Sequence, residues 1–255
     1  MGQYIPAESP LHRCDARSKI AATAGLSLSL LIAPGWTNTL VVSGVIVILI
    51  ILSRINFRSY LANWRILFIL VLITVLLQIL LIPGKTILRL SFINITQEGL
   101  ISGSMLLVKL SGIILLAAWL TFTTRPAQLT AGLERIFSPL GKLGFPVQEL
   151  VMIMTLSLRF LPLLVEETLM VYRAQLVRGA NWRTGTLGQK GRYLIALLVP
   201  ILRLALERAE YLVEAMENRG YNSGPARTPL YPQSLHLGDG LLVAVTCLIL
   251  VMQVI

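Results

Sequence analysis

Runs of apolar residues alternate with charged and turn-forming segments along the chain. The five runs are residues 20–33, 39–52, 66–82, 100–122 and 240–255. A helix rises about 1.5 Å per residue, so about 20 residues cross the roughly 30 Å hydrocarbon core of a bilayer. The third and fourth runs are long enough, and the last, at 16 residues, is short. The first two are joined by Pro34-Gly35-Trp36 and form either a tight transmembrane hairpin or a re-entrant pair. The pattern predicts an all-α integral membrane protein with about five transmembrane helices.

The segment between the fourth and fifth runs, residues 123–239, has a different pattern. It contains 13 basic and 9 acidic residues but is still rich in Leu, Val, Ile and Met. Its pattern predicts three helices, near 126–137, Val147–Val177 and 193–219, the two long ones kinked at an internal proline, Pro162 or Pro200. We therefore divide the chain into 1–122, with an N-terminal segment and four transmembrane helices, 123–239, with the long helices, and 240–255, the last transmembrane helix.

Lys and Arg residues gather on one side of the apolar runs. Three precede residue 20, three lie at 53–65 and 13 at 123–239, whereas the Pro34 turn has none and residues 83–99 have two. Cytoplasmic loops carry the excess of basic residues, and the short loops alone divide six to two. We therefore expect the N-terminus and residues 123–239 in the cytoplasm and the C-terminus outside. Lys109 is the one charged residue inside the five runs.

The composition excludes an ordinary soluble protein. Only 13% of the residues are charged and 55% are hydrophobic, with a mean hydropathy of +0.76. Soluble domains carry about 25% charged residues, so this chain needs lipid or a large assembly to cover its apolar surface. The net charge of +10 does not indicate nucleic-acid binding, because the basic residues flank the apolar runs and do not cover one soluble domain.

The sequence offers no grouping of residues for catalysis or metal binding. Its two cysteines and two histidines are isolated from one another: Cys14, Cys247, His12 and His236. None has the spacing to a second ligand that a metal site requires. Glu166-Glu167 is better explained as two charged residues on a cytoplasmic helix than as an acid/base pair. We expect no catalytic residue, no metal site and no cofactor in this chain.

The two long helices of residues 123–239 end on the same short motif. Val177-Arg178-Gly179 closes the first, and Asn218-Arg219-Gly220 closes the second. Capping explains either motif alone, because Gly commonly follows a helix end and a cation suits the negative end of the helix dipole. Two such ends on paired long helices of a membrane protein favour a functional role as well.

With these two motifs the chain resembles the transmembrane coupling (T) component of energy-coupling factor (ECF) transporters. That family is marked by two X-Arg-Gly motifs at the ends of two long cytoplasmic coupling helices. The longer form Met216-Glu217-Asn218-Arg219-Gly220-Tyr221 and the N-terminal stretch 2–19, with Ser9-Pro10-Leu11-His12-Arg13, are also similar, so the resemblance covers essentially the whole chain. The family more usually has Leu and Pro at the positions of Cys14 and Ala16, and Ala before each Arg-Gly.

The resemblance implies a scaffold without catalytic activity, in the cytoplasmic membrane of a bacterium or archaeon. Two cytoplasmic ABC ATPase subunits would hydrolyse ATP, and each would receive one Arg-Gly motif. A small membrane protein that binds the substrate, the S component, would pack on the apolar halves of the coupling helices. The residues expected at that interface are Met152, Met154, Leu158, Leu161, Leu197 and Leu198.

Other functions are compatible with parts of the pattern. The N-terminal resemblance favours a shared module that serves several vitamin S components, but a dedicated cobalt, nickel or biotin system remains open. A lipid-modifying membrane enzyme would need ionisable residues in the apolar runs, where Lys109 is the one charged residue. Channels and secondary transporters commonly have helices broken at the membrane midplane and two repeated halves. The five apolar runs fit that pattern poorly.

Overall fold

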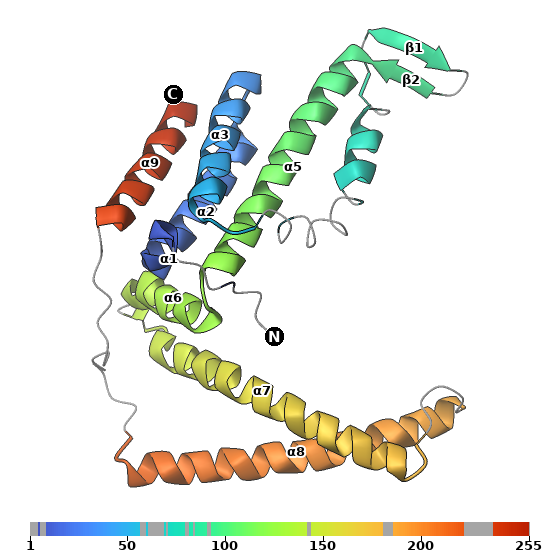
Figure 1. Ribbon diagram of the computed structural model, residues 1–255, viewed down its shortest axis with the longest axis vertical. Helices are drawn as coiled ribbons and strands as arrows, with labels where there is room; N and C mark the ends of the chain where they lie inside the picture. Colours follow the sequence, from blue (N-terminus) through green and yellow to red (C-terminus); the bar gives the residue numbers. More distant parts are fainter. Residues whose placement is uncertain are drawn as a thin grey trace. The chain divides into compact units, whose positions relative to one another are not determined.

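The computed structural model describes residues 5, 9–56, 60, 69, 71–79, 82–83, 85–90, 93–141, 144–180, 186–221 and 237–254 (Figure 1). The chain divides into two compact units. We call Phe137–Pro232 the arm unit, and Gly2–Ile136 together with Gln233–Ile255 the bundle unit. The chain therefore leaves the bundle unit once, after Ile136, and returns to it once, at Gln233.

The bundle unit is built on helices that lie side by side in Figure 1. They are α2 (Ala16–Ile32), α3 (Trp36–Leu52), α5 (Gln97–Thr123) and α9 (Leu237–Val254), preceded by the short α1 (Pro10–Arg13). The helix α2 packs against α9, α5 and α3, and α3 also packs against α5. These helices confirm the first, second, fourth and fifth apolar runs as helical. Residues 71–79 are helical within the third run, and the rest of that run lies largely outside the described residues.

Two groups of buried side chains hold the bundle helices together. One group joins α2, α3, α5 and α9 through Leu26, Leu30, Val42, Ile46, Leu116 and Ile249. The other lies nearer the end of α5, where the rings of Tyr60 and Phe122 meet edge to face with centroids 5.1 Å apart. Outside these groups many apolar side chains of the bundle are exposed, as expected of helices whose outer faces contact lipid.

Glycines allow the closest approaches between these helices. A Cβ on Gly25 of α2 would lie 2.5 Å from Cγ2 of Thr246 in α9. A Cβ on Gly112 of α5 would lie 2.8 Å from Leu30. Membrane helices use small residues in this way, because close backbone approach replaces the hydrophobic effect as the source of packing energy.

A small β-hairpin precedes α5, where the sequence predicted only a loop. Strand β1 (Thr86–Leu90) pairs antiparallel with β2 (Ile93–Thr96). Thr96 ends the hairpin and caps α5, because its side chain accepts a hydrogen bond from the Gly99 N–H. Apart from this hairpin the described elements are helices, which confirms the all-α class.

The arm unit contains two long helices, α7 (Val147–Val177) and α8 (Leu187–Asn218). The predicted bounds of α7 are confirmed, and α8 begins six residues earlier than predicted. Gln189 explains the early start: its side chain accepts from the N–H of Thr186 at 3.0 Å and so closes the first turn. Both helices continue through Pro162 and Pro200. The connecting helix α6 (Pro126–Gly141) extends beyond the predicted 126–137 and passes Pro139.

Within the described residues, two helices are long and apolar enough to cross a membrane, α5 and α7, while α3 and most of α9 are shorter apolar helices. The sequence analysis placed α7 in the cytoplasm, against the membrane face or another protein. Composition explains why α7 fits both descriptions. Up to Leu164 it is mostly apolar, with Glu149 and Arg159 as its charged residues, but its second half carries Glu166, Glu167 and Arg173. The cytoplasmic location of α7 stays a prediction.

Candidate functional site at the two Arg-Gly helix ends

The first Arg-Gly motif forms a complete C-terminal cap on α7. Arg178 is the C-cap residue, and its N–H donates to the Ala174 carbonyl at 3.2 Å. Gly179 has φ of +88°, and its N–H donates to Leu176, while the Ala180 N–H donates to Gln175, both at 3.0 Å. This pair of bonds is the Schellman arrangement, which needs a left-handed residue after the C-cap. Glycine is therefore required by the backbone at position 179.

The second motif ends α8 with the same geometry. Arg219 is the C-cap residue, and Gly220 has φ of +69°. The Gly220 N–H donates to Glu217 and the Tyr221 N–H to Met216, each at 2.9 Å. The capping interpretation is thus correct for both glycines. It accounts for their backbone and leaves the arginine side chains to be explained.

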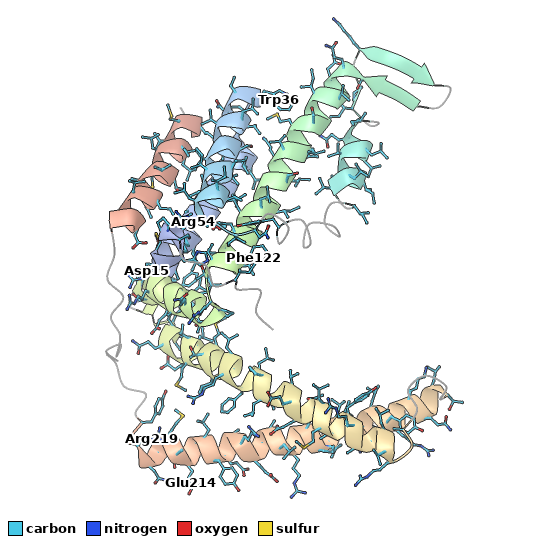
Figure 2. All side chains as sticks on the ribbon, viewed as in Figure 1. Asp15, Trp36, Arg54, Phe122, Glu214 and Arg219 are labelled. Carbon is cyan, nitrogen blue, oxygen red and sulfur yellow. The ribbon has the colours of Figure 1, made fainter. Side chains whose placement is uncertain are left out.

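Both arginine side chains are exposed at the helix ends, as is Val177, whose side chain is 90% exposed. Figure 2 shows Arg219 at the end of α8. Among the described residues, neither guanidinium makes a hydrogen bond or an ion pair. An exposed guanidinium on a rigid helix end retains five donors for a carboxylate or a carbonyl of another molecule.

The helices α7 and α8 run in opposite directions and contact each other at several points. The Tyr221 hydroxyl donates to the Met152 sulfur at 2.7 Å, and the Gln175 side chain donates to the Ala196 carbonyl at 3.3 Å. Each contact brings the end of one helix to the first half of the other. The two Arg-Gly ends therefore lie at opposite ends of the helix pair, about 35 Å apart at 1.5 Å per residue.

Between these two ends the helix pair has an apolar groove of about 410 Å³. Leu156, Phe160 and Leu164 of α7 face Ala205 and Leu212 of α8 across it. At its charged end Arg208 forms an ion pair with Glu167, whose side chain is 13% exposed. The ion pair is half-buried, and breaking it would leave a charge without a partner.

The side chains predicted to bind an S component divide into two sets. Met154, Leu161 and Leu198 are about half exposed, at 50%, 53% and 52%. Met152, Leu158 and Leu197 are less exposed, and Met152 already contacts Tyr221. The structure describes no fully buried residue on α7 or α8. Apolar surface of this extent needs lipid or a protein to cover it.

A buried polar cluster in the bundle unit was not anticipated from the sequence. Asp239, at the start of α9, accepts from the Asp15 N–H at 2.7 Å, and its Oδ1 lies 2.7 Å from the Ser18 hydroxyl. Lys19 is 1% exposed, and its ammonium donates to the Thr123 carbonyl at 3.2 Å and the His12 carbonyl at 3.3 Å. Two sequence features could have indicated this cluster. Asp239 is a lone acid at the edge of the last apolar run, and Lys19 is a basic residue directly before the first run.

Two titratable groups of the N-terminal segment border this cluster. Burial, followed by the negative charge of Asp239, raises the pKa of the Cys14 thiol. Burial lowers the pKa of His12, so that its imidazole is neutral at pH 7. Neutral His12 can donate from Nε2 to the Ile5 carbonyl at 3.2 Å and accept from the Ser9 hydroxyl at 2.7 Å. Both side chains therefore act here as neutral groups.

The apolar bundle and the exposed apolar faces of α7 and α8 define an all-α membrane protein. Residues 7–230 match the family model described as cobalt transport protein, CbiQ.

Three relatives are each named energy-coupling factor transporter transmembrane protein EcfT. The Brevibacillus brevis protein is 36% identical over all of this chain and 96% of its own length. The Heliobacterium modesticaldum protein is 38% identical over 91% of this chain and 87% of its own. The Thermanaerovibrio acidaminovorans protein is 39% identical over 94% and 89%. The chain belongs to this CbiQ/EcfT family of ECF transporter transmembrane proteins.

Proposed function

We propose that the chain couples ATP hydrolysis to substrate import as the T component of an ECF-type ABC transporter. Two cytoplasmic ATPase subunits hydrolyse ATP, and this chain, a non-catalytic scaffold, carries their motion to a membrane S component that binds the substrate. The observation that carries the proposal is the pair of identically capped Arg-Gly ends, exposed and about 35 Å apart on one helix pair. The names of the relatives agree with this role.

In this proposal each helix end docks in one ATPase. Arg178, with Val177 and Gly179, enters one subunit, and Arg219, with Asn218 and Gly220, enters the other. The Schellman cap fixes the backbone that carries each arginine, so binding has to order only the side chain. The separation of about 35 Å lets two globular subunits bind without overlap and makes each helix a lever that moves with its subunit.

The S component covers the exposed apolar side of the same helices. Met154 and Leu161 of α7 and Leu198 of α8 are each about half exposed and are the best contact positions in the described structure. Met152 is a poorer choice for a test, because its sulfur accepts from Tyr221 and a substitution there would also disturb the end of α8. Lipid covers the remaining apolar faces of the bundle.

The imported substrate is a vitamin in our proposal, delivered by S components that share this module. The N-terminal resemblance favours the shared module, whereas the family description, cobalt transport protein, favours a dedicated cobalt or nickel system. Uptake of labelled vitamins and of cobalt by cells with and without this chain separates the two. If the cells take up cobalt but no vitamin through this chain, a dedicated cobalt system replaces the vitamin proposal.

Arginine substitutions test the docking role directly. If Arg178 and Arg219 only cap their helices, Ala costs about 0.3–1 kcal/mol of local stability and uptake is nearly normal. If each guanidinium docks in an ATPase, Ala costs roughly 2–5 kcal/mol of binding, because partner acceptors lose their donors. Lys keeps the charge but lacks the planar fork, so it should rescue docking poorly. We expect the double Ala variant to lose ATPase attachment and uptake at normal membrane abundance.

Leu198→Asp is the matched control for the arginine variants. It places a charge on the exposed apolar side of α8, so it should release the S component and leave the ATPases attached. Detergent pull-downs of both partners, substrate uptake and membrane abundance are measured for each variant. Near-normal uptake in the double Ala variant at normal abundance would show that the arginines are caps only and remove the basis of the proposal.

A further inference from the structure

The two connections of the arm unit end at one place in the bundle unit. The outgoing connection is the end of α5 followed by α6, and the chain leaves the bundle after Ile136. The returning connection enters at Gln233 and continues into α9. Any force that the arm unit exerts on the bundle through the chain passes along these two connections. The residues that hold these two connections to the bundle are therefore of interest for coupling.

The outgoing connection is fastened to the first turn of α2 by two contacts. Lys19 donates to the Thr123 carbonyl, one of the acceptors at the end of α5 that have no partner within the helix. Three residues later α6 begins, and a Cβ on Gly132 would lie 3.0 Å from the Cβ of Ala16. The backbone of α6 thus touches the start of α2 directly. Figure 2 shows Asp15, at the start of α2, and Phe122, at the end of α5.

The returning connection is fastened to the same turn. Asp239, in the first turn of α9, is 2% exposed and accepts from the Asp15 N–H, with the Ser18 hydroxyl equally close. Its carboxylate lies beside the N-terminus of α2, where the helix dipole favours a negative charge. A Cβ on Gly238 would lie 3.5 Å from the Cys14 sulfur. Burial lowers the pKa of Lys19, and the nearby negative charge of Asp239 opposes this shift.

We propose that the first turn of α2, Asp15–Lys19, is a clamp that fixes both connections of the arm unit to the bundle. The clamp stays closed during transport, so a displacement that arrives at α6 or at the start of α9 is passed to the first turn of α2. Lys19 and Asp239 are positioning residues that hold the connections. The proposal rests on the coupling function proposed above.

Removing the Asp239 acceptor should uncouple the transporter. In the intact complex, Asp239→Ala is expected to keep ATP hydrolysis and to lower substrate uptake per ATP about fivefold or more, since buried donors are left without an acceptor. Asp239→Asn keeps one oxygen for both donors and should stay near the original ratio. Thr246→Val, elsewhere on α9, removes a hydroxyl that donates only within its own helix to Leu242 and serves as the matched control. An unchanged ratio in Asp239→Ala overturns the clamp.

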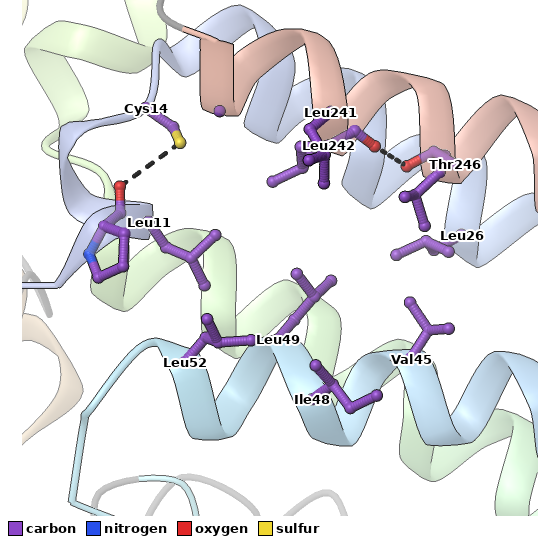
Figure 3. Close-up of a pocket in the computed structure, with 13 residues that line it drawn as sticks. Leu11, Cys14, Leu26, Val45, Ile48, Leu49, Leu52, Leu241, Leu242 and Thr246 are labelled. Carbon is purple, nitrogen blue, oxygen red and sulfur yellow. Dashed lines mark hydrogen bonds between the residues drawn. The ribbon is translucent and has the colours of Figure 1, made fainter.

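A disulfide tests the clamp even if Asp239→Ala folds poorly. In a Cys247→Ser background, Gly238→Cys should cross-link to the native Cys14 under mild oxidation, because the two positions are almost at disulfide spacing. Cys14 lines a cavity of about 330 Å³ with Leu241 and Leu242 of α9 (Figure 3). The cross-linked transporter should keep full uptake, and oxidation should restore coupling to Asp239→Ala. Loss of uptake on cross-linking would overturn a clamp that stays closed.

The cross-link also separates this inference from the coupling function. Formation of the disulfide in the Gly238→Cys variant is measured by mass spectrometry on the purified chain, with no ATPase or S component present. If the coupling function fails, no variant shows ATP-driven uptake, although the bond still forms. If only the clamp fails, the original chain transports normally and Asp239→Ala transports equally well. Failure of the bond to form contradicts the contact on which the clamp depends.

Discussion

Lys109 is the charged residue within the apolar runs, and the structure gives it a local role. Its ammonium donates to the Ala33 carbonyl at 2.8 Å and lies 3.4 Å from the Leu31 carbonyl. Both carbonyls belong to the end of α2, where the last backbone acceptors have no partner within the helix. A cation there also suits the negative end of the helix dipole. Lys109 thus joins the middle of α5 to the end of α2.

Replacing Lys109 by Met should destabilise the bundle without preventing membrane insertion. Met has a similar length but no donor, so the α2 carbonyls lose their partner at a cost of about 1–3 kcal/mol. We expect a lower melting temperature of the detergent-purified chain, measured by tryptophan fluorescence. Lys109→Arg retains donors and is the control. A melting temperature equal to that of the original chain would show that water or lipid satisfies these carbonyls.

The residue scale is where the sequence was least informative. The arginine motifs were visible because Arg and Gly adjoin in the chain. The contact of Asp239 with Asp15 and Ser18 joins residues more than 220 positions apart, and no local pattern indicates such a pairing. Lys19 could be counted as a topology signal but not recognised as buried, because burial depends on where Thr123 lies.

The sequence predicted the positions of whole helices more accurately than the residues at which they begin and end. Hydrophobic runs located α2, α3, α5 and α9, since a membrane-spanning helix must be apolar over most of its length. The helices extend beyond the runs because polar residues such as Gln97 and Arg17 occupy their first turns. The hairpin of β1 and β2 was missed, because its alternating Ile, Leu and Thr residues are too few to distinguish from a loop.

The crossing of α2 and α9 provides a prediction at the scale of elements. Val at Gly25 places a methyl-bearing Cβ 2.5 Å from Cγ2 of Thr246, a β-branched side chain that cannot turn away freely. The helices must separate, at a cost of about 1–3 kcal/mol. Gly44→Val in α3 is the control, because nothing lies within 4 Å of a Cβ there.

Both glycine variants are measured by membrane abundance and by melting temperature in detergent. Each change replaces Gly by the same residue in a helix, so the difference between them reports the helix crossing and not helix propensity. We expect Gly25→Val to reduce both quantities and Gly44→Val to leave them nearly unchanged. Equal behaviour of the two variants would mean that α9 does not pack on α2 at Gly25.

At the scale of the whole molecule, charge and hydropathy assign different roles to the two units. The bundle unit has buried apolar groups and few charges inside, as a membrane unit requires. The arm unit has long helices with apolar residues exposed and none of the described residues on α7 or α8 buried. The sequence could predict these helices and their motifs. It also predicted capping by Gly179 and Gly220, but not the specific hydrogen bonds of each cap, which depend on the backbone angles there.

The orientation of the molecule in the membrane is the prediction on which the docking proposal depends, because ATPases bind only from the cytoplasm. Short loops carry six basic residues on the proposed inner side and two on the outer, which places the start of α5 outside and the arm unit inside.

In a Cys14→Ser and Cys247→Ser background, Gln97→Cys should react with an impermeant maleimide added to intact cells, or to spheroplasts where an outer membrane blocks access. Leu187→Cys, at a side chain 90% exposed in the structure, should react only after the membrane is opened. The pair controls for reactivity, since both positions lie in the first turn of a helix and are exposed. Labelling of Leu187→Cys alone in intact cells would place Arg178 and Arg219 on the side without ATP, and neither could then receive an ATPase.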